Sequence, residues 1–173
     1  MRASSILAFV AALAAAPAAA ELTASGPDGM ASQNEAVVPL ATDEVWITLT
    51  DPSAWWDGSH SYSGDTANLL FDPVAGGCLC ELLPDGGGTV EHLRIVTALP
   101  GRLLRMSGAM GPLQSEALTG TLSISLEAVD GGTRISWDYL VSGFARFDLE
   151  EIAPAVDRMH SEQLARLVQE LGG

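Results

Sequence analysis

The sequence predicts an α+β fold in which a curved antiparallel sheet of about seven strands wraps around one long C-terminal helix. Between residues 67 and 141, short stretches of strand-forming residues alternate with turns. A single amphipathic segment follows from Asp148 to Leu171. A small sheet that holds one helix usually leaves its concave side unfilled, so we expect an internal cavity for an apolar or amphipathic ligand.

The N-terminal end has the layout of a secretory signal peptide. Arg2 precedes the apolar run 6–16, and the small residues 18–20 follow it. We expect residues 1–20 to be the signal peptide, cleaved after Ala20. The run is too short and too rich in alanine for a stable membrane span, which needs about 20 apolar residues. The mature protein is therefore expected to be periplasmic or secreted, with no membrane insertion after signal cleavage.

The chain is strongly acidic. Its 22 Asp and Glu residues outnumber its 8 Lys and Arg residues, which gives a formal net charge of −14 at pH 7. Such a charge repels nucleic acids and anionic membrane surfaces, so we expect neither as a partner. The expected partner is a small apolar or aromatic molecule, and the expected oligomeric state is a monomer or a weak homodimer.

Residues 21–33 are expected to form a flexible leader, because they are rich in polar and small residues and show no apolar period. A single domain is expected over residues 34–173. Its first strand is predicted at about residues 35–40.

Two short helices and six further strands are predicted after this first strand. The first helix begins at Thr42, and Pro52 ends it and starts a second helix that holds Trp55 and Trp56. Gly-rich segments between several of the strands are typical of hairpin turns. The strands are predicted at residues 67–71, 77–83, 89–99, 103–108, 115–129 and 133–141.

The last two strands and the terminal helix indicate which faces point inward. In the strands, one alternating set is apolar and is expected to face the core. It contains Leu118, Gly120, Leu122, Ile124, Leu126, Thr133, Ile135, Trp137, Tyr139 and Val141. The helix carries an apolar stripe of Ile152, Val156, Met159, Leu164, Leu167 and Leu171. Pro154 either begins the helix after a short turn or kinks it.

This order of segments resembles the helix-grip SRPBCC (START-like) superfamily. The segments that carry the resemblance include DPSAWW, CLCELLPDGGG, ALPGRLLRMSG and VDRMHSEQLARL, and it covers residues 33–171. Within the superfamily, the chain is similar to the branch of heat-shock ATPase activator-like and polyketide cyclase/dehydrase proteins. The resemblance implies a β-α-α-β6-α fold whose cavity binds hydrophobic or aromatic small molecules. It implies no particular reaction, because members range from lipid carriers to cyclases.

Glu81 is the first candidate for chemistry. It lies two residues after Leu79, so both side chains share one strand face. If Leu79 faces the core, Glu81 faces the cavity, where burial would raise its pKa and suit it to act as a general acid or base. The alternative is a hydrated or arginine-paired carboxylate near the rim.

The next strand offers His92 and Arg94 on one face, opposite Leu93 and Ile95. In a regular strand only one of these pairs can point inward. If the polar pair points inward, it places a titrating group and an anion partner beside Glu81. If the apolar pair does, both polar side chains lie outside.

Further ligand contacts are predicted from a loop, a strand and the terminal helix. His60 and Tyr62 lie in the loop GSHSYSGD, which either overhangs the cavity mouth or is held to the sheet by their hydrogen bonds. Arg105 points either into the cavity or to the outer face. The aromatic and helical candidates could instead be core residues. The full predicted binding set is Trp56, His60, Tyr62, Leu79, Glu81, Arg94, Arg105, Trp137, Tyr139, Met159 and Gln163.

No metal site and no cofactor are expected, because the chain lacks HxH, HExxH and CxxC spacings. Cys78 and Cys80 share one face of a predicted strand. In an extended strand their Cα atoms would be about 6.6 Å apart with parallel Cβ vectors, so no disulfide is expected between them.

Two functional hypotheses follow. The first is an exported protein that holds an apolar, aromatic or lipid-like molecule between the sheet and the terminal helix. The alternative is a cyclase- or dehydrase-type enzyme in which Glu81, with His92 or Tyr139, transfers protons on a bound substrate. A role like that of the heat-shock ATPase activators is disfavoured by the export signal.

Overall fold

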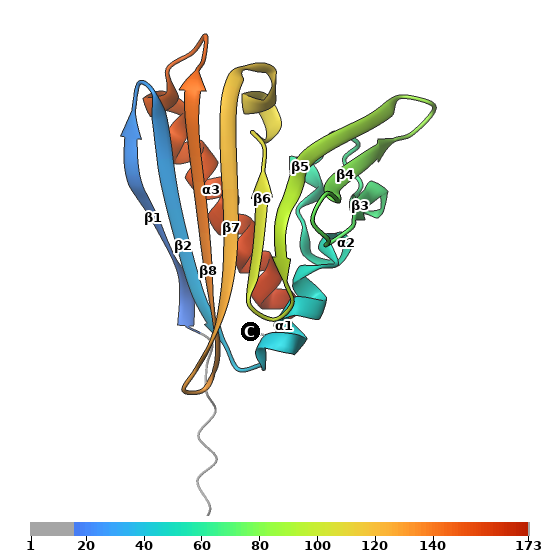
Figure 1. Cartoon of the computed structure of the whole chain (residues 1–173), viewed down its shortest axis with the longest axis vertical. Coiled ribbons are helices and arrows are strands. Elements are labelled where there is room, and N and C mark those ends of the chain that lie inside the picture. The colour runs from blue at the N-terminus through green and yellow to red at the C-terminus, as the bar shows by residue number, and fades with distance from the viewer. Residues whose placement is uncertain (1–15, 173) are drawn as a thin grey trace, which may run out of the picture.

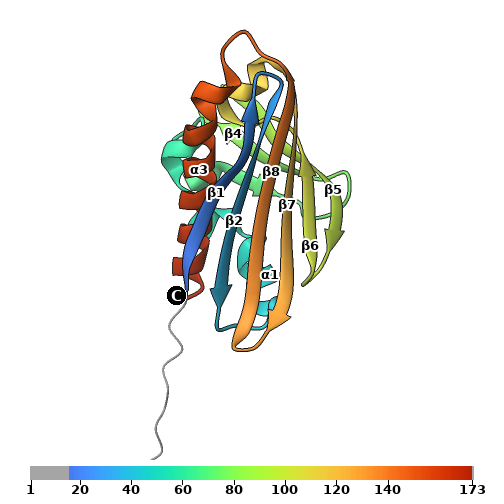
Figure 2. The same cartoon turned by 90° about the vertical axis from the view of Figure 1, so that its left-hand side faces the viewer.

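The computed structural model describes residues 16–172, which form one eight-stranded antiparallel sheet with a long helix across its concave face (Figure 1). The strand order is β1-β2-β8-β7-β6-β5-β4-β3. Figure 2 shows the helix α3 running along the inner side of β1 and β2. The predicted α+β fold with a curved sheet and a C-terminal helix is confirmed.

The elements follow the predicted order with one additional strand at the start. The strands are β1 (Ala16–Gly26), β2 (Gly29–Val38), β3 (Leu69–Phe71), β4 (Cys78–Leu83), β5 (Gly88–Leu99), β6 (Leu103–Ser107), β7 (Ala117–Val129) and β8 (Gly132–Phe144). The α-helices are α1 (Thr42–Leu49), α2 (Pro52–Trp55) and α3 (Leu149–Glu170). Three short 3₁₀ helices are η1 (Gly58–His60), η2 (Thr66–Asn68) and η3 (Gly111–Ser115).

The sequence predicted a flexible leader over residues 21–33. This prediction is wrong, because the segment belongs to the hairpin of β1 and β2. The buried residues of β2 alternate, and they are Met30, Ser32, Asn34, Ala36 and Val38. Ser32 donates a hydrogen bond to Asp157 of α3 (2.5 Å), and the Asn34 amide donates to Ser32 (3.0 Å). These buried polar residues explain why the alternation of β2 shows no apolar period.

The predicted signal peptide overlaps the edge of the described residues. Residues 1–15 lie outside them, whereas residues 16–20 begin β1. Cleavage after Ala20 would therefore leave β1 starting at Glu21, and the signal peptide stays a prediction.

The inward faces of β7, β8 and α3 are those predicted. Nine of the ten alternating residues are buried, and Leu118 at the strand end is half-buried. In α3, the Asp148 carboxylate accepts a hydrogen bond from the Glu150 N–H (2.8 Å) and caps the first turn. Pro154 lies inside α3, so the helix begins before the proline.

An irregularity in β5 decides the question of which residues there face inward. Leu79 pairs with Leu93, but Cys80 pairs with Glu91, so His92 is an extra residue in the ladder. Both His92 and Leu93 are buried, with exposed fractions of 7% and 1%. The expectation that only one of the two sets could point inward is wrong, because a β-bulge interrupts the strict alternation of side chains.

Cys78 and Cys80 form a disulfide, contrary to the sequence prediction. Their Cα atoms are 5.4 Å apart, closer than in a regular extended strand and within the usual range for a bridge. The bulge of β5 lies opposite this segment, since the register shifts between Leu79 and Cys80, and the short Cα distance shows that β4 is not fully extended there.

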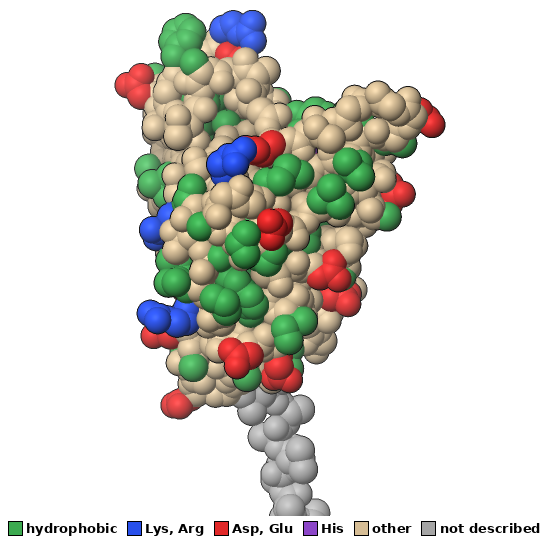
Figure 3. All heavy atoms as spheres, turned by 45° about the vertical axis from the view of Figure 1, so that its right-hand side comes forward, with side chains coloured by type: hydrophobic (Ala, Val, Ile, Leu, Met, Phe, Trp, Pro, Cys, Tyr) green, Lys and Arg blue, Asp and Glu red, His purple; other side chains and the backbone are tan. Residues whose placement is uncertain are grey.

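The outer surface carries acidic side chains on several elements, and Figure 3 shows them spread over one face with arginines along one side. Among the described residues, no helix is both long enough and apolar enough to cross a membrane.

Candidate functional site

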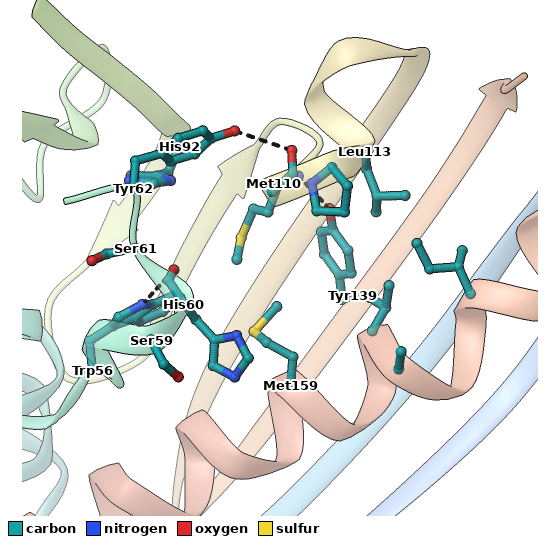
Figure 4. A pocket seen from close by; sticks show the side chains of 15 residues that line it. Trp56, Ser59, His60, Ser61, Tyr62, His92, Met110, Leu113, Tyr139 and Met159 are labelled. Atoms are coloured by element: carbon teal, nitrogen blue, oxygen red, sulfur yellow. Dashed lines mark hydrogen bonds between the residues drawn. The ribbon is translucent and has the colours of Figure 1, made fainter. Parts of the chain in front are cut away.

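A cavity of about 500 Å³ lies between α3 and the inner face of the sheet. Its mouth is bordered by residues 56–65, which we call the mouth loop, and by residues 108–115, which we call the cap segment. Figure 4 shows Met159 of α3 pointing across the cavity toward Met110 of the cap segment. The lining residues are Trp56, Ser59, His60, Ser61, Tyr62, His92, Met110, Gly111, Pro112, Leu113, Tyr139, Ile152, Ala155, Val156 and Met159.

The cap segment is positioned by β7 and β8. The Tyr139 hydroxyl accepts a hydrogen bond from the Met110 N–H (3.2 Å) and donates to the Gly108 carbonyl oxygen (3.3 Å). Gly120 permits this approach, because a Cβ there would lie 2.1 Å from the Gly108 oxygen. Burial raises the pKa of Tyr139 to about 12, so its hydroxyl stays neutral at physiological pH.

The mouth loop is tied to the cap segment across the cavity. The Tyr62 hydroxyl donates to the Gly111 carbonyl oxygen (3.4 Å) of the cap segment. Within the mouth loop, the Trp56 indole N–H donates to the His60 carbonyl oxygen (3.3 Å). At the start of the loop, the Gln163 amide oxygen accepts from the Asp57 N–H (2.9 Å). These contacts hold an irregular loop against the sheet and the helix.

Glu81 is fully buried behind the cavity wall and does not line the cavity. Its carboxylate accepts hydrogen bonds from the N–H groups of Tyr62 (3.0 Å) and Ser63 (2.6 Å) and lies 2.8 Å from Nε2 of His92. Burial opposes ionisation of Glu81, but the hydrogen bonds from Ser63, Tyr62 and His92 outweigh it and lower its pKa to about 2.

Two expectations about Glu81 are therefore wrong. Its pKa is lowered, not raised as a cavity acid would require, because backbone donors of the mouth loop surround it. It is also not a hydrated rim residue, since none of its surface is exposed. Glu81 anchors the mouth loop and contacts the cavity only through the ring of His92.

His92 is the part of this pair that reaches the cavity. Its ring packs beside that of Tyr62, with centroids 5.7 Å apart. Glu81 contacts Nε2, and among the described residues no group forms a hydrogen bond with Nδ1. The bulge in β5 and the carboxylate behind the ring thus fix a histidine in the cavity wall.

His160 is a buried polar residue that the sequence analysis did not single out. Its Nδ1 accepts a hydrogen bond from the Trp137 indole N–H (3.0 Å), and its ring packs on Tyr139 at 4.3 Å between centroids. Burial lowers the pKa of His160 to about 3, so the ring is neutral. It supports the floor of the cavity without lining it.

Six of the residues predicted from the sequence line the cavity, and they are Trp56, His60, Tyr62, His92, Tyr139 and Met159. Leu79 and Trp137 are core residues that border a gap of only about 20 Å³. Glu81 and Gln163 are buried in supporting contacts with the mouth loop.

The two predicted arginines point away from the cavity. Arg94 forms an ion pair with Glu91 and donates to the Gly76 carbonyl oxygen (3.2 Å). Arg105 is exposed and donates to the Ser123 hydroxyl (2.9 Å). Both lie in the outward alternation of their strands, so placing them in the binding set is incorrect.

Most of the cap segment and the first turns of α3 were not predicted from the sequence as cavity wall. Ile152 and Val156 were visible only as members of the apolar stripe of the helix, because the pattern does not separate cavity wall from core. The missed residues are Ser59, Ser61, Met110, Gly111, Pro112, Leu113, Ile152, Ala155 and Val156. Within residues 16–172, no group of three or more His, Cys, Asp or Glu side chains is arranged to hold a metal ion.

Comparison with known proteins places this geometry in a family. The profile of the family described as "Polyketide cyclase / dehydrase and lipid transport" matches residues 30–172. The Mll3558 protein from Rhizobium loti is similar in structure, with a TM-score of 0.61, 20% identity and coverage of 82% of this chain and 96% of that chain. An uncharacterized protein from Rhizobium leguminosarum gives a TM-score of 0.59 and 16% identity, with coverage of 90% and 97%.

CalU16 from Micromonospora echinospora gives a TM-score of 0.54 and 18% identity, with coverage of 88% of this chain and 81% of that chain. A search of curated proteins gave no significant match. At these identities the structural neighbours establish the fold alone.

Proposed function

Because the chain belongs to the polyketide cyclase / dehydrase and lipid transport family of the SRPBCC superfamily, we propose that it binds an apolar or aromatic small molecule in the cavity above α3. The observation that carries this proposal is the cavity itself. Its volume of about 500 Å³ falls within the range of small-molecule sites. A helix packed directly on the sheet would leave no cavity of this size between them.

The character of the walls supports an apolar ligand. Met110, Leu113, Val156 and Met159 supply flexible or branched apolar surface, and Trp56 supplies an aromatic wall. Methionine side chains adapt their shape readily, which suits a site that must enclose a ligand. We propose that the ligand enters past the mouth loop and lies along α3.

We also propose that the protein is exported. The N-terminal sequence supports this proposal through its charged start, its apolar run and its small-residue end. The disulfide between Cys78 and Cys80 is consistent with an oxidising compartment, because such bonds are rare in reducing cytosol.

Filling the cavity tests the binding proposal. Met159→Trp places a larger side chain in the cavity, and Arg158→Trp places the same side chain on the exposed neighbour, which does not line it. We expect Met159→Trp to weaken binding of the neutral dye Nile red at least tenfold, whereas Arg158→Trp binds like the wild type. Fluorescence titration measures both, and circular dichroism checks that both variants are folded. Equal affinity in the two variants would refute binding in this cavity.

A second candidate function is proton-transfer catalysis of the cyclase or dehydrase type. The observation that favours it is the pair of Glu81 and His92, since a carboxylate that orients a histidine is a recurring general-base arrangement. His92, rather than Glu81, would touch the substrate, and Glu81 would act as the positioning residue. Incubating the wild type and His92→Gln with the molecule extracted from the native protein tests this candidate. Conversion by the wild type alone supports catalysis, and unchanged ligand with both proteins argues for a carrier.

A further inference from the structure

His92 is a buried polar residue in the cavity wall. Its Nε2 faces the Glu81 carboxylate at 2.8 Å. An ionised carboxylate only accepts hydrogen bonds, and the low pKa of Glu81 keeps it ionised, so Nε2 must carry the proton. In the neutral ring Nδ1 then holds a lone pair, and this atom has no partner among the described residues.

Three other polar groups of the wall are already engaged, and the remaining two, Ser59 and His60, belong to exposed residues of the mouth loop. The Tyr139 hydroxyl contacts Met110 and Gly108, and the Tyr62 hydroxyl donates to Gly111. The Ser61 hydroxyl donates to the Gly58 carbonyl oxygen (2.9 Å) and accepts from the Gly64 N–H (3.0 Å). The His92 lone pair is consequently the acceptor that a buried side chain of the wall offers to a ligand.

The charges around the cavity argue against an anionic ligand. No arginine is among the lining residues, and the chain contains no lysine. The buried Glu81 carboxylate lies directly behind the His92 ring. A ligand carboxylate would lose its hydration and would have no arginine or lysine partner in the wall. It would also be repelled by the Glu81 carboxylate on the other side of the His92 ring.

A cationic ligand is disfavoured for a different reason. The Glu81 oxygens already accept hydrogen bonds from two backbone N–H groups and face His92. An ammonium group in the cavity would therefore be desolvated without direct contact to the carboxylate. A neutral hydroxyl needs only one acceptor and fits the site best.

From these contacts we infer that the ligand is a neutral apolar molecule with a hydroxyl group that donates a hydrogen bond to Nδ1 of His92. This inference rests on the proposed binding function and adds the ligand's polar group and its orientation. The hydroxyl end lies against β5 and the mouth loop, and the apolar body extends between Met110 and Met159 toward Val156.

Calorimetric titration at pH 8 with three naphthalene probes tests the inference. The probes are 2-naphthol, 2-methylnaphthalene, which lacks the donor, and 2-naphthoate, which is anionic. We expect His92→Phe to weaken 2-naphthol about threefold to tenfold more than it weakens 2-methylnaphthalene, the range of one net hydrogen bond. The wild type is expected to bind 2-naphthoate more weakly than 2-naphthol.

His60→Phe is the matched variant, because His60 also lines the cavity but faces Glu162 at 3.5 Å. It should change the affinities for 2-naphthol and 2-methylnaphthalene in equal proportion. If His60→Phe loses the preference for 2-naphthol over 2-methylnaphthalene and His92→Phe keeps it, the assignment is overturned. Tighter binding of 2-naphthoate than of 2-naphthol by the wild type would also overturn it. If no probe binds the wild type, the proposed function itself fails, whereas equal loss of both neutral probes refutes only the role of His92.

A measurement on the wild type does not depend on how the variants fold. Long-range ¹H–¹⁵N NMR spectra report which nitrogen of His92 carries the proton. We expect the Nε2–H form in the free protein and a shift of the Nδ1 signal on addition of 2-naphthol. A proton on Nδ1 at pH 8, or an unchanged Nδ1 signal in the saturated complex, would contradict the inference.

Discussion

Glu81 shows how a single residue can have the predicted position and a different role. Its strand face was predictable from its spacing to Leu79, and it is indeed inward and fully buried. Its hydrogen-bond donors come from the mouth loop, 18 and 19 residues away, and no sequence pattern marks them. Those donors convert a candidate acid into an ionised structural anchor.

Two of the groups with shifted pKa values, Glu81 and His160, lose their stabilising contributions in different pH ranges. For Glu81 the folded pKa of about 2 lies below the ordinary value of 4.5, so its contribution is complete above pH 4.5 and disappears as the pH falls toward 2. For His160 the folded pKa of about 3 lies below the ordinary 6.5. The unfolded chain then binds more protons between these values, and stability falls as the pH drops below 6.5.

We predict that His160→Asn removes the part of the pH dependence between 6.5 and 5. The amide oxygen of the introduced asparagine can still accept from the Trp137 indole, whereas the buried titrating ring is gone. Urea unfolding at several pH values measures this slope, which for one group is at most about 1.4 kcal/mol per pH unit. An unchanged slope in the variant would mean that His160 is not the group responsible.

At the scale of elements, regular patterns were predictable and local irregularities were not. The alternation in β7 and β8 and the stripe of α3 gave the correct faces, because each follows the period of its element. The bulge at His92 has no such signature, since the extra residue is defined by pairing with β4. The disulfide was missed for the same reason.

The close approach of β7 to the cap segment provides an element-level prediction. An alanine Cβ at position 120 would lie 2.1 Å from the Gly108 carbonyl oxygen and 2.8 Å from the Tyr139 hydroxyl. We expect Gly120→Ala to displace the cap segment and to lower the free energy of unfolding by about 1–3 kcal/mol. Gly26→Ala is the control, because nothing lies within 4 Å of its added Cβ. Equal stability of the two variants by urea unfolding would contradict this account of the cap segment.

At the scale of the whole molecule, the fold was predictable because many weak signals agree. Strand lengths, turn residues and one long amphipathic helix all favour the same architecture. The N-terminal hairpin escaped prediction because its inward face includes Ser32 and Asn34, two buried polar residues that form hydrogen bonds in the interior. The cavity could be expected from the architecture, but its walls depend on the cap segment and the mouth loop, whose positions are fixed by long-range contacts.

The central claim is that the cavity above α3 holds a small apolar molecule. Native mass spectrometry of the protein purified from the cells that naturally produce it tests this claim most directly, with Met159→Trp prepared in the same way. The account predicts one small molecule per chain in the wild type, released by organic extraction, and its absence from Met159→Trp. A wild type without bound molecule, or the same molecule retained by both proteins, would contradict it.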